Sequence, residues 1–307
     1  MARRKKGNPI NGWIILDKPV GMTSTQAVGK VRWLFQAQKA GHAGTLDPLA
    51  TGVLPIALGE ATKTVPYAVD GLKAYRFTVR WGEETDTDDA EGRVVRSSDK
   101  RPTRGDIEAI LPQFHGEIMQ TPPQYSAIKI DGNRAYDLAR GGEQVALEPR
   151  PIVIDHLDLV DIPDADTAIF EAECGRGTYV RALARDMGRL LGCLGHVTQL
   201  RRTQVAAFTA ESAVTVAELE AAHDAEDGGA ALAGYLQPVE LALADLIEVP
   251  VSQHDAARLA RGQPVLMRGR DAPIMTGEAY AMCKGMLIAL CEIEKGELVP
   301  VRVFNQK

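Results

Sequence analysis

The stretch with the clearest potential for chemistry is residues 41–63, GHAGTLDPLATGVLPIALGEATK. It contains one carboxylate, Asp47, directly before a proline, which disfavours the α region for the residue it follows. Gly41 and Gly44 tolerate positive φ and let a partner approach the backbone. An apolar block at residues 52–59 can be buried beneath such a loop. The pattern predicts a stiff loop that presents one reactive carboxylate, although Asp-Pro is also typical of an ordinary surface turn.

A second element with possible chemistry is a helix expected over residues 178–191, which carries an apolar stripe on one side. Arg181, Arg185 and Arg189 recur at every fourth position on the other side. A solvated basic face is the ordinary interpretation, and we adopt it for Arg189. Arg181 falls in the first turn, where the helix dipole disfavours a cation by roughly 0.3–1 kcal/mol. A nearby carboxylate or phosphate would offset this cost.

The third candidate is Tyr75, at the start of a segment, residues 73–82, in which apolar and polar side chains alternate. Alternation of this kind predicts a half-buried strand. The pattern by itself makes Tyr75 a core aromatic residue, since aromatics on such a face are usually buried. Its place at the strand's beginning also allows it to line a cleft.

These motifs together resemble the TruB family of pseudouridine synthases. More than twenty consecutive positions of residues 41–63 fit the family's signature, and the family's GTYxR and HVxxLRR elements also occur. The resemblance implies that Asp47 is the catalytic residue, that Arg181 is its partner and that Tyr75 is the active-site tyrosine. It implies no cofactor and no metal, in keeping with a sequence that has no Walker A motif and no cluster of metal ligands.

The same resemblance suggests residues that bind the substrate. Tyr179 would contact the target base, Leu200 would close over it, and His42 would fill the gap that an extruded base leaves. A hydrogen-bonded loop residue is the alternative for His42. Lys18, in the LDKP element, would lie near the substrate, with a surface lysine as the alternative. Backbone contacts to RNA are expected from three further cations: Arg185, Arg201 and Arg202.

The fold expected from the resemblance is α+β, with a mixed, mostly antiparallel sheet and flanking helices, the pseudouridine synthase fold. We divide the chain into a basic flexible tail at 1–10, a catalytic domain at 11–245 and a small β-rich domain at 246–307. The last of these is similar to a PUA domain and would bind RNA. Ser24 is the expected N-cap of an early helix, and residues 85–92 are expected to form an acidic connecting loop.

Composition sets limits on partners and location. The chain has 35 basic and 41 acidic residues, a net charge of −6. Nucleic-acid binders are usually basic, but phosphate binding depends on local potential, so RNA is not excluded. The four cysteines show no metal-ligand spacing. With no apolar run of membrane-spanning length and no apolar segment behind the basic N-terminus, we expect no membrane association and a cytoplasmic location.

The resemblance implies that the chain isomerises uridine 55, in the T loop of tRNA, to pseudouridine. The base would be flipped out, and an aspartate-dependent step would cleave and rejoin the glycosidic bond. Attack at C1′, attack at C6 and a glycal route all remain open. We expect a monomer with no obligatory protein partner. The alternatives are an RNA-guided relative, and a tRNA-folding chaperone or RNA-binding module that uses the same cleft.

Overall fold

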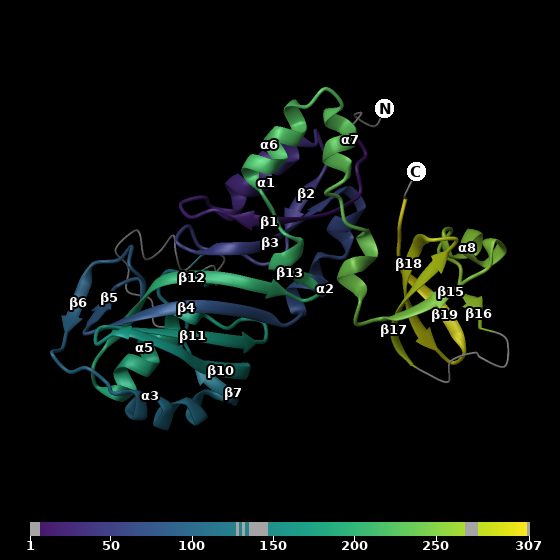
Figure 1. Cartoon of the computed structure of the whole chain (residues 1–307). Coiled ribbons are helices and arrows are strands. Elements are labelled where there is room, and N and C mark those ends of the chain that lie inside the picture. Colours follow the sequence, from purple (N-terminus) through teal and green to yellow (C-terminus); the bar gives the residue numbers. More distant parts are fainter. Residues whose placement is uncertain (1–6, 127–128, 131–132, 135–146, 268–275, 306–307) are drawn as a thin grey trace.

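The computed structural model describes residues 7–126, 129–130, 133–134, 147–267 and 276–305. Most of this chain is built on one large sheet, and a smaller sheet follows it at the C-terminal end (Figure 1). The strands of the large sheet are β1 (Gly12–Lys18), β2 (Ala40–His42), β3 (Thr51–Leu58), β4 (Lys73–Trp81), β7 (Gly116–Gln120), β10 (Arg150–Asp164), β11 (Thr167–Cys174), β12 (Gly195–Val205), β13 (Phe208–Thr209) and β14 (Val214–Thr215).

The order of these strands is β14-β1-β3-β12-β4-β11-β10-β7, with β2 paired to β3 and β13 to β12. Within the described residues the pairs β1–β14 and β3–β12 are parallel and the other pairs of this sheet are antiparallel. This confirms the predicted mixed, mostly antiparallel sheet. The β3–β12 pair is short, with Thr51 opposite Arg201 and Gly52 opposite Arg202. It joins two halves of the sheet that differ in their covering helices.

The helices flank the sheet as the α+β prediction required. Helices α5 (Val180–Leu191) and α3 (Arg104–Ile110) pack beside the half that contains β4, β12 and β10 (Figure 1). Helices α1 (Ser24–Leu34) and α6 (Val216–Asp224) pack beside β1, β2 and β3, and α7 (Gly228–Ala233) packs on α6. None of the helices in the described residues is long and apolar enough to cross a membrane.

Three short helical segments lie between the large sheet and the C-terminal sheet: η1 (Gly59–Lys63), α2 (Val65–Asp70) and η4 (Val239–Leu243). The remaining elements before the C-terminal sheet are two short 3-10 helices, η2 (Leu111–Phe114) and η3 (Ala210–Ser212), and two small two-stranded sheets. One small sheet pairs β5 (Glu83–Thr85) with β6 (Val94–Ser97), and the other pairs β8 (Lys129–Ile130) with β9 (Asn133–Arg134).

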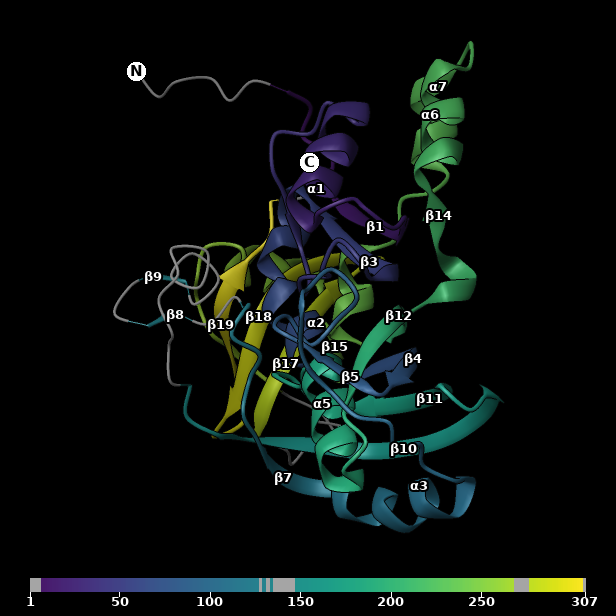
Figure 2. The ribbon, with the colours of Figure 1, turned by 90° about the vertical axis from the view of Figure 1, so that its left-hand side faces the viewer.

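The C-terminal part consists of β15 (Ile247–Pro250), α8 (Gln253–Leu259), β16 (Val265–Leu266), β17 (Gly277–Cys283), β18 (Met286–Glu294) and β19 (Glu297–Val303). Its sheet has the order β15-β17-β18-β19-β16 and lies behind the large sheet in the view of Figure 2. Trp13 and Val53 of the large sheet share one buried cluster with Tyr280, Leu290 and Phe304. The two sheets are therefore held together by a common apolar core.

The beginning of α1 differs from the prediction. Thr23, and not Ser24, is the N-cap: its side chain accepts from the Gln26 N–H, and the Gln26 side chain accepts from the Thr23 N–H. The Ser24 hydroxyl is buried and instead bonds the backbone of Leu46, 22 residues away. Both residue types are good caps, so the local sequence does not decide between them. Thr23 is the cap because the Ser24 hydroxyl is already bonded to Leu46.

Gly52, at the β3–β12 junction, offers a test of how tightly the halves are joined. Its φ is +98°, and a Cβ there would lie 2.1 Å from the backbone oxygen of Arg202. We expect Gly52→Ala to lower the free energy of unfolding by about 3 kcal/mol or more, since strain and overlap add. Gly21→Ala is the control, because Gly21 has φ +81° but open space around it. It should lose only about 1–2 kcal/mol. Urea unfolding measures both, and equal losses would contradict the close approach.

Candidate active site

The centre of the candidate site is a contact between Asp47 and Arg181. Asp47 stands on the loop between β2 and β3, while Arg181 is in the first turn of α5, beside the other half of the sheet. Arg181 Nη2 lies 2.9 Å from Asp47 Oδ2. The Arg181 side chain is only 6% exposed, whereas that of Asp47 is 37% exposed. The carboxylate is therefore held from behind and open in front.

The rest of the Arg181 guanidinium is fixed as well. It donates to the backbone carbonyls of Thr87, at 2.8 Å, and Tyr125, at 2.9 Å. Asp89 Oδ2 lies 3.4 Å from Nη1. Because guanidinium donors have a fixed planar geometry, these contacts leave the group one orientation in which to meet Asp47.

The backbone on both sides of Asp47 is also anchored by buried side chains. The Ser24 hydroxyl bonds both the N–H and the carbonyl of Leu46, each at 2.9 Å. Lys18, which is fully buried, donates to the Met22 carbonyl at 2.7 Å and reaches the Pro48 carbonyl at 3.5 Å. Burial lowers the pKa of Lys18 to about 8. Lys18 thus lies beneath the loop, outside the cleft's lining, and supports it.

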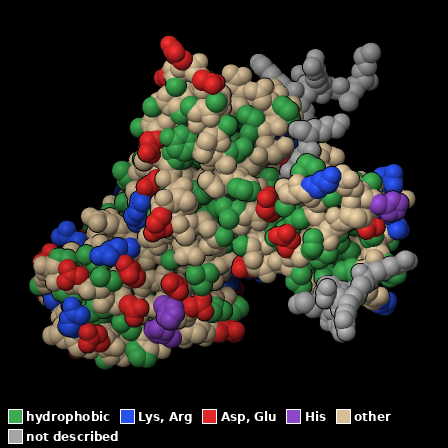
Figure 3. All heavy atoms as spheres, turned by 45° about the vertical axis from the view of Figure 1, so that its right-hand side comes forward, with side chains coloured by type: hydrophobic (Ala, Val, Ile, Leu, Met, Phe, Trp, Pro, Cys, Tyr) green, Lys and Arg blue, Asp and Glu red, His purple; other side chains and the backbone are tan. Residues whose placement is uncertain are grey.

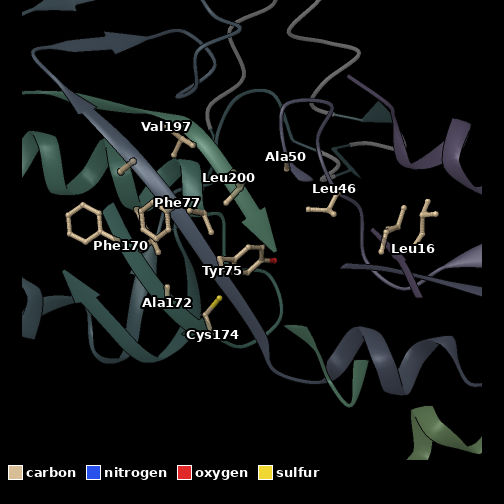
Figure 4. Close-up of a cluster of buried hydrophobic side chains, with 14 of the residues drawn as sticks. Leu16, Leu46, Ala50, Tyr75, Phe77, Phe170, Ala172, Cys174, Val197 and Leu200 are labelled. Carbon is tan, nitrogen blue, oxygen red and sulfur yellow. The ribbon is translucent and has the colours of Figure 1, made fainter. Parts of the chain in front are cut away.

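A cleft of about 260 Å³ opens in front of Asp47. Tyr75, a buried residue of β4, lines it together with Arg181 and Leu200. In Figure 4 the Tyr75 ring extends from its strand, and its hydroxyl oxygen lies on the side that faces Leu46. Burial raises the pKa of Tyr75, and the guanidinium of Arg202 works against that rise. The three residues expected to take part in the reaction, Asp47, Tyr75 and Arg181, therefore all line this cleft.

Comparison with known proteins shows the family to which the chain belongs. A family model described as "TruB family pseudouridylate synthase (N terminal domain)" matches residues 32–180, and one described as "tRNA pseudouridylate synthase B C-terminal domain" matches residues 181–244. The protein named tRNA pseudouridine synthase B from Nitrobacter winogradskyi is 61% identical over 98% of this chain and 85% of its own. That from Brucella anthropi is 57% identical over 99% of each chain. The chain belongs to the TruB family of pseudouridine synthases.

Solved structures give the same fold for this TruB chain at lower identity. The Cbf5 chain of a Cbf5-Nop10-Gar1 complex is similar with a TM-score of 0.75 and 27% identity, over 96% of this chain and 84% of that one. The archaeal box H/ACA sRNP Nop10-Cbf5 complex gives a TM-score of 0.73 and 26% identity, over 99% and 91%. The pseudouridine synthase fold expected from the sequence is therefore confirmed.

Tyr179 and Leu200 approach the cleft from two different elements. Tyr179 is the residue before α5, and the side-chain amide of Gln120 forms two hydrogen bonds with its backbone. The Tyr179 N–H donates to Gln120 Oε1 at 2.9 Å, and Gln120 Nε2 donates to the Tyr179 carbonyl at 3.2 Å. Burial raises the pKa of the Tyr179 hydroxyl. Leu200 lies on β12 opposite Phe77. Both border the cleft next to Asp47.

His42 occupies a different place from the other candidates. It ends β2, opposite Ile56 of β3, and is not among the residues that line the cleft. Among the described residues its buried Nδ1 atom has no hydrogen-bond partner. Burial lowers the pKa of His42, and the positive charge of Arg202 lowers it further. Both effects disfavour the charged imidazole and favour the neutral one.

All three cations expected to bind RNA phosphates have partners within the protein, and two of them are buried. Arg185 is buried, with Nη1 2.9 Å from Asp88, and Arg202 is 1% exposed with its donors on backbone carbonyls. The prediction of phosphate contacts is wrong for both because their charges are used inside the protein. Arg201 pairs with Asp17 through both terminal nitrogens.

The acidic segment 85–92 has a role that sequence reasoning missed. It connects β5 to β6 as expected, but Asp88 and Asp89 are buried against α5, where they meet Arg185 and Arg181. Arg189 is exposed, as expected for it, and its guanidinium also donates two hydrogen bonds to the Glu84 carboxylate. The sequence does contain an acidic run and a helix with regularly spaced arginines. That the two would pair could not be predicted, because it depends on which elements the fold makes neighbours.

Asp88 provides a test of this buried pairing through pH. Burial raises its pKa from an ordinary value of 3.8 to about 6 despite Arg185. Between pH 4 and 6 the folded state therefore holds a proton that the unfolded state has lost, so this group's contribution to stability falls as pH rises. Relative to the wild type, Asp88→Asn should gain about 2–3 kcal/mol in unfolding free energy between pH 4 and pH 7.

Urea unfolding at a series of pH values measures this relative gain, which does not depend on any constant loss from the substitution. Asp86→Asn, on an exposed position of the same segment, controls for the removal of one negative charge. A relative loss for Asp88→Asn over the same range would show that attraction to Arg185 outweighs burial.

Proposed function

We propose that this chain isomerises uridine 55, in the T loop of tRNA, to pseudouridine. Its membership of the TruB family and the names of its relatives support this activity. The observation that carries the proposal is the geometry of Asp47: a carboxylate open to a cleft on one side and held by the buried Arg181 on the other. A fixed anion of this kind is what the removal and return of a base at C1′ requires.

In the proposed reaction Asp47 acts on the extruded nucleotide and Arg181 keeps its carboxylate ionised and aimed. The N1–C1′ bond breaks, the base turns, and a C5–C1′ bond forms. The C5 hydrogen then leaves as a proton, and N1 ends with a proton of its own. Tyr75 is the stacking platform for the base and takes part in the proton movement. Preorganised charge of this kind supplies much of an enzyme's rate.

The uridine must leave its RNA loop to reach Asp47, and unstacking a base costs a few kcal/mol. We propose that the neutral ring of His42 fills the space left in the RNA, and that Tyr179 and Leu200 hold the base once it is in the cleft. An uncharged imidazole stacks between bases without the cost of burying a charge. Lys18 we assign to supporting the loop, since its charge is used on backbone carbonyls.

The RNA surface is proposed at the mouth of the cleft. Arg176 lines this mouth with its side chain 73% exposed, although it also pairs with Asp70. On the face drawn in Figure 3 acidic and basic side chains are mixed, in line with the overall charge of −6. Phosphate contacts are therefore expected from a local group of cations around the cleft.

We further propose that residues 246–307 form a PUA-like RNA-binding domain, after a catalytic domain at 11–245 and a tail at 1–10. We also propose that the chain works in the cytoplasm, as a monomer without an obligatory protein partner. The RNA-guided alternative has less support, because identity is 57–61% to the proteins named tRNA pseudouridine synthase B and 26–27% to Cbf5.

The decisive experiment uses unmodified tRNA with tritium at uridine C5. The protein alone should release tritium, because C5 loses its hydrogen when the new bond forms. Asp47→Ala should lower the single-turnover rate by at least about 1,000-fold, as expected for loss of a reacting group, with its tRNA affinity kept. Asp245→Ala serves as the control, because Asp245 is an exposed carboxylate that does not line the cleft.

The other outcomes distinguish the alternatives. Tritium release only with added guide RNA and protein partners would favour the RNA-guided alternative, and tight tRNA binding with no release would leave the chaperone. Arg181→Met should cut the rate far more than the affinity. An equal loss in both would mean that Arg181 contacts RNA instead of serving Asp47.

A further inference from the structure

Arg202 is the most deeply buried cation bordering the cleft, and the proposed reaction gives it no role. It lies where β12 pairs with both neighbouring strands, opposite Tyr75 on β4 and opposite Gly52 on β3. Arg202 is only 1% exposed, yet it lines the same cleft as Asp47. A guanidinium at this position touches both halves of the sheet at the point where they join.

The contacts of Arg202 are with oxygen atoms of the backbone. Nε donates to the Val53 carbonyl at 2.8 Å, Nη2 to the Gly44 carbonyl at 3.1 Å and Nη1 to the Thr45 carbonyl at 3.4 Å. Gly44 makes this approach possible: its φ is +86°, and a Cβ there would lie 3.3 Å from Nη1. Arg202 therefore fixes the two peptide groups that lead into the segment with Asp47.

The charge of Arg202 has no paired carboxylate within the described residues, although ion pairs hold its neighbour Arg201 and the other buried arginines of the site. Removing an ion from water without such a partner costs several kcal/mol, and burial accordingly lowers the pKa of Arg202. Arg202 lies directly opposite Tyr75 on the neighbouring strand, and both residues line the cleft together with Asp47. The positive charge of Arg202 also opposes the rise in the pKa of Tyr75 that burial causes. A buried charge that is costly to keep, next to two groups expected to react, is expected to serve them.

We propose that Arg202 is a positioning residue for the reaction: it donates to the Tyr75 hydroxyl oxygen and fixes the backbone before Asp47, so that both side chains meet the nucleotide in one geometry. This inference rests on the proposed function. A guanidinium has donors only, so it makes the phenol oxygen an acceptor on its own side. The phenol proton is then left to point away from Arg202, toward the substrate.

The central test replaces Arg202 by Met, which keeps length and removes the donors. Single-turnover tritium release should fall by about 100-fold, the size expected when reacting groups lose their alignment, while tRNA affinity changes by less than about 3-fold because Arg202 makes no surface contact. Arg76→Met is the matched control. It removes a guanidinium next to Tyr75 on the same strand that is exposed and paired with Glu171, and it should keep the wild-type rate.

A double-mutant cycle asks whether Arg202 acts through Tyr75. In a Tyr75→Phe background, Arg202→Met should lower the rate by clearly less than it does alone, since residues in one hydrogen-bonded unit are non-additive. Full additivity of the two losses would overturn the proposal. If Arg202→Met does not fold, Arg202→Lys replaces it in the cycle: it keeps the charge but lacks the planar fork and should also lose rate with affinity preserved.

A measurement without substrate separates this inference from the proposed function. Protein labelled with ¹³C at the ζ carbon of tyrosine gives an NMR signal for Tyr75, assigned by its absence in Tyr75→Phe. That signal should shift in Arg202→Met and Arg202→Lys and stay in place in Arg76→Met. An unchanged signal overturns the role of Arg202 even if the wild type is active, and a shifted signal supports it even if the wild type has another substrate.

Discussion

The contact between Asp47 and Arg181 is the interaction on which the site depends. Its two ends come from opposite halves of the large sheet: the loop before β3 supplies the carboxylate, and α5 supplies the guanidinium. The 2.9 Å separation therefore exists only if the short parallel pairing of β3 with β12 has its observed register. A slip at that junction would move the carboxylate away from its partner while leaving each half intact.

Buried cations surround the loop that carries Asp47, and the way their charges are satisfied bears on the chemistry that we propose for it. Lys18 and Arg202 give their donors mainly to backbone carbonyls, and Arg181 gives two of its donors to carbonyls as well. Carbonyl dipoles solvate a cation without neutralising it. The loop is thereby stiffened and left in a positive local potential, and the half-open carboxylate of Asp47 is the anion that this potential favours.

The local parts of this structure could be predicted from the sequence, while the long-range pairings could not. The alternation before and after Phe77 gave β4, and the apolar stripe gave α5, because one face of each is buried in a single large core. The roles of Lys18, Arg185 and Arg202 were not predictable in this way. A buried charge looks like a surface charge in a sequence, and its partner is set by which strands become neighbours.

The C-terminal sheet has a part in the same construction, apart from any contact with RNA. Strand β3 runs from the loop that carries Asp47 directly into η1, where Glu60 accepts a hydrogen bond from the Asn305 N–H at 2.8 Å. Lys63 donates to the Val303 carbonyl at 2.8 Å and lies over the Phe304 ring. The strand that positions Asp47 is therefore held at its start by the buried residues under the loop and at its end by the C-terminal sheet. A strand fixed at both ends leaves the loop before it little freedom to move, so the C-terminal sheet contributes to the rigidity of the candidate active site.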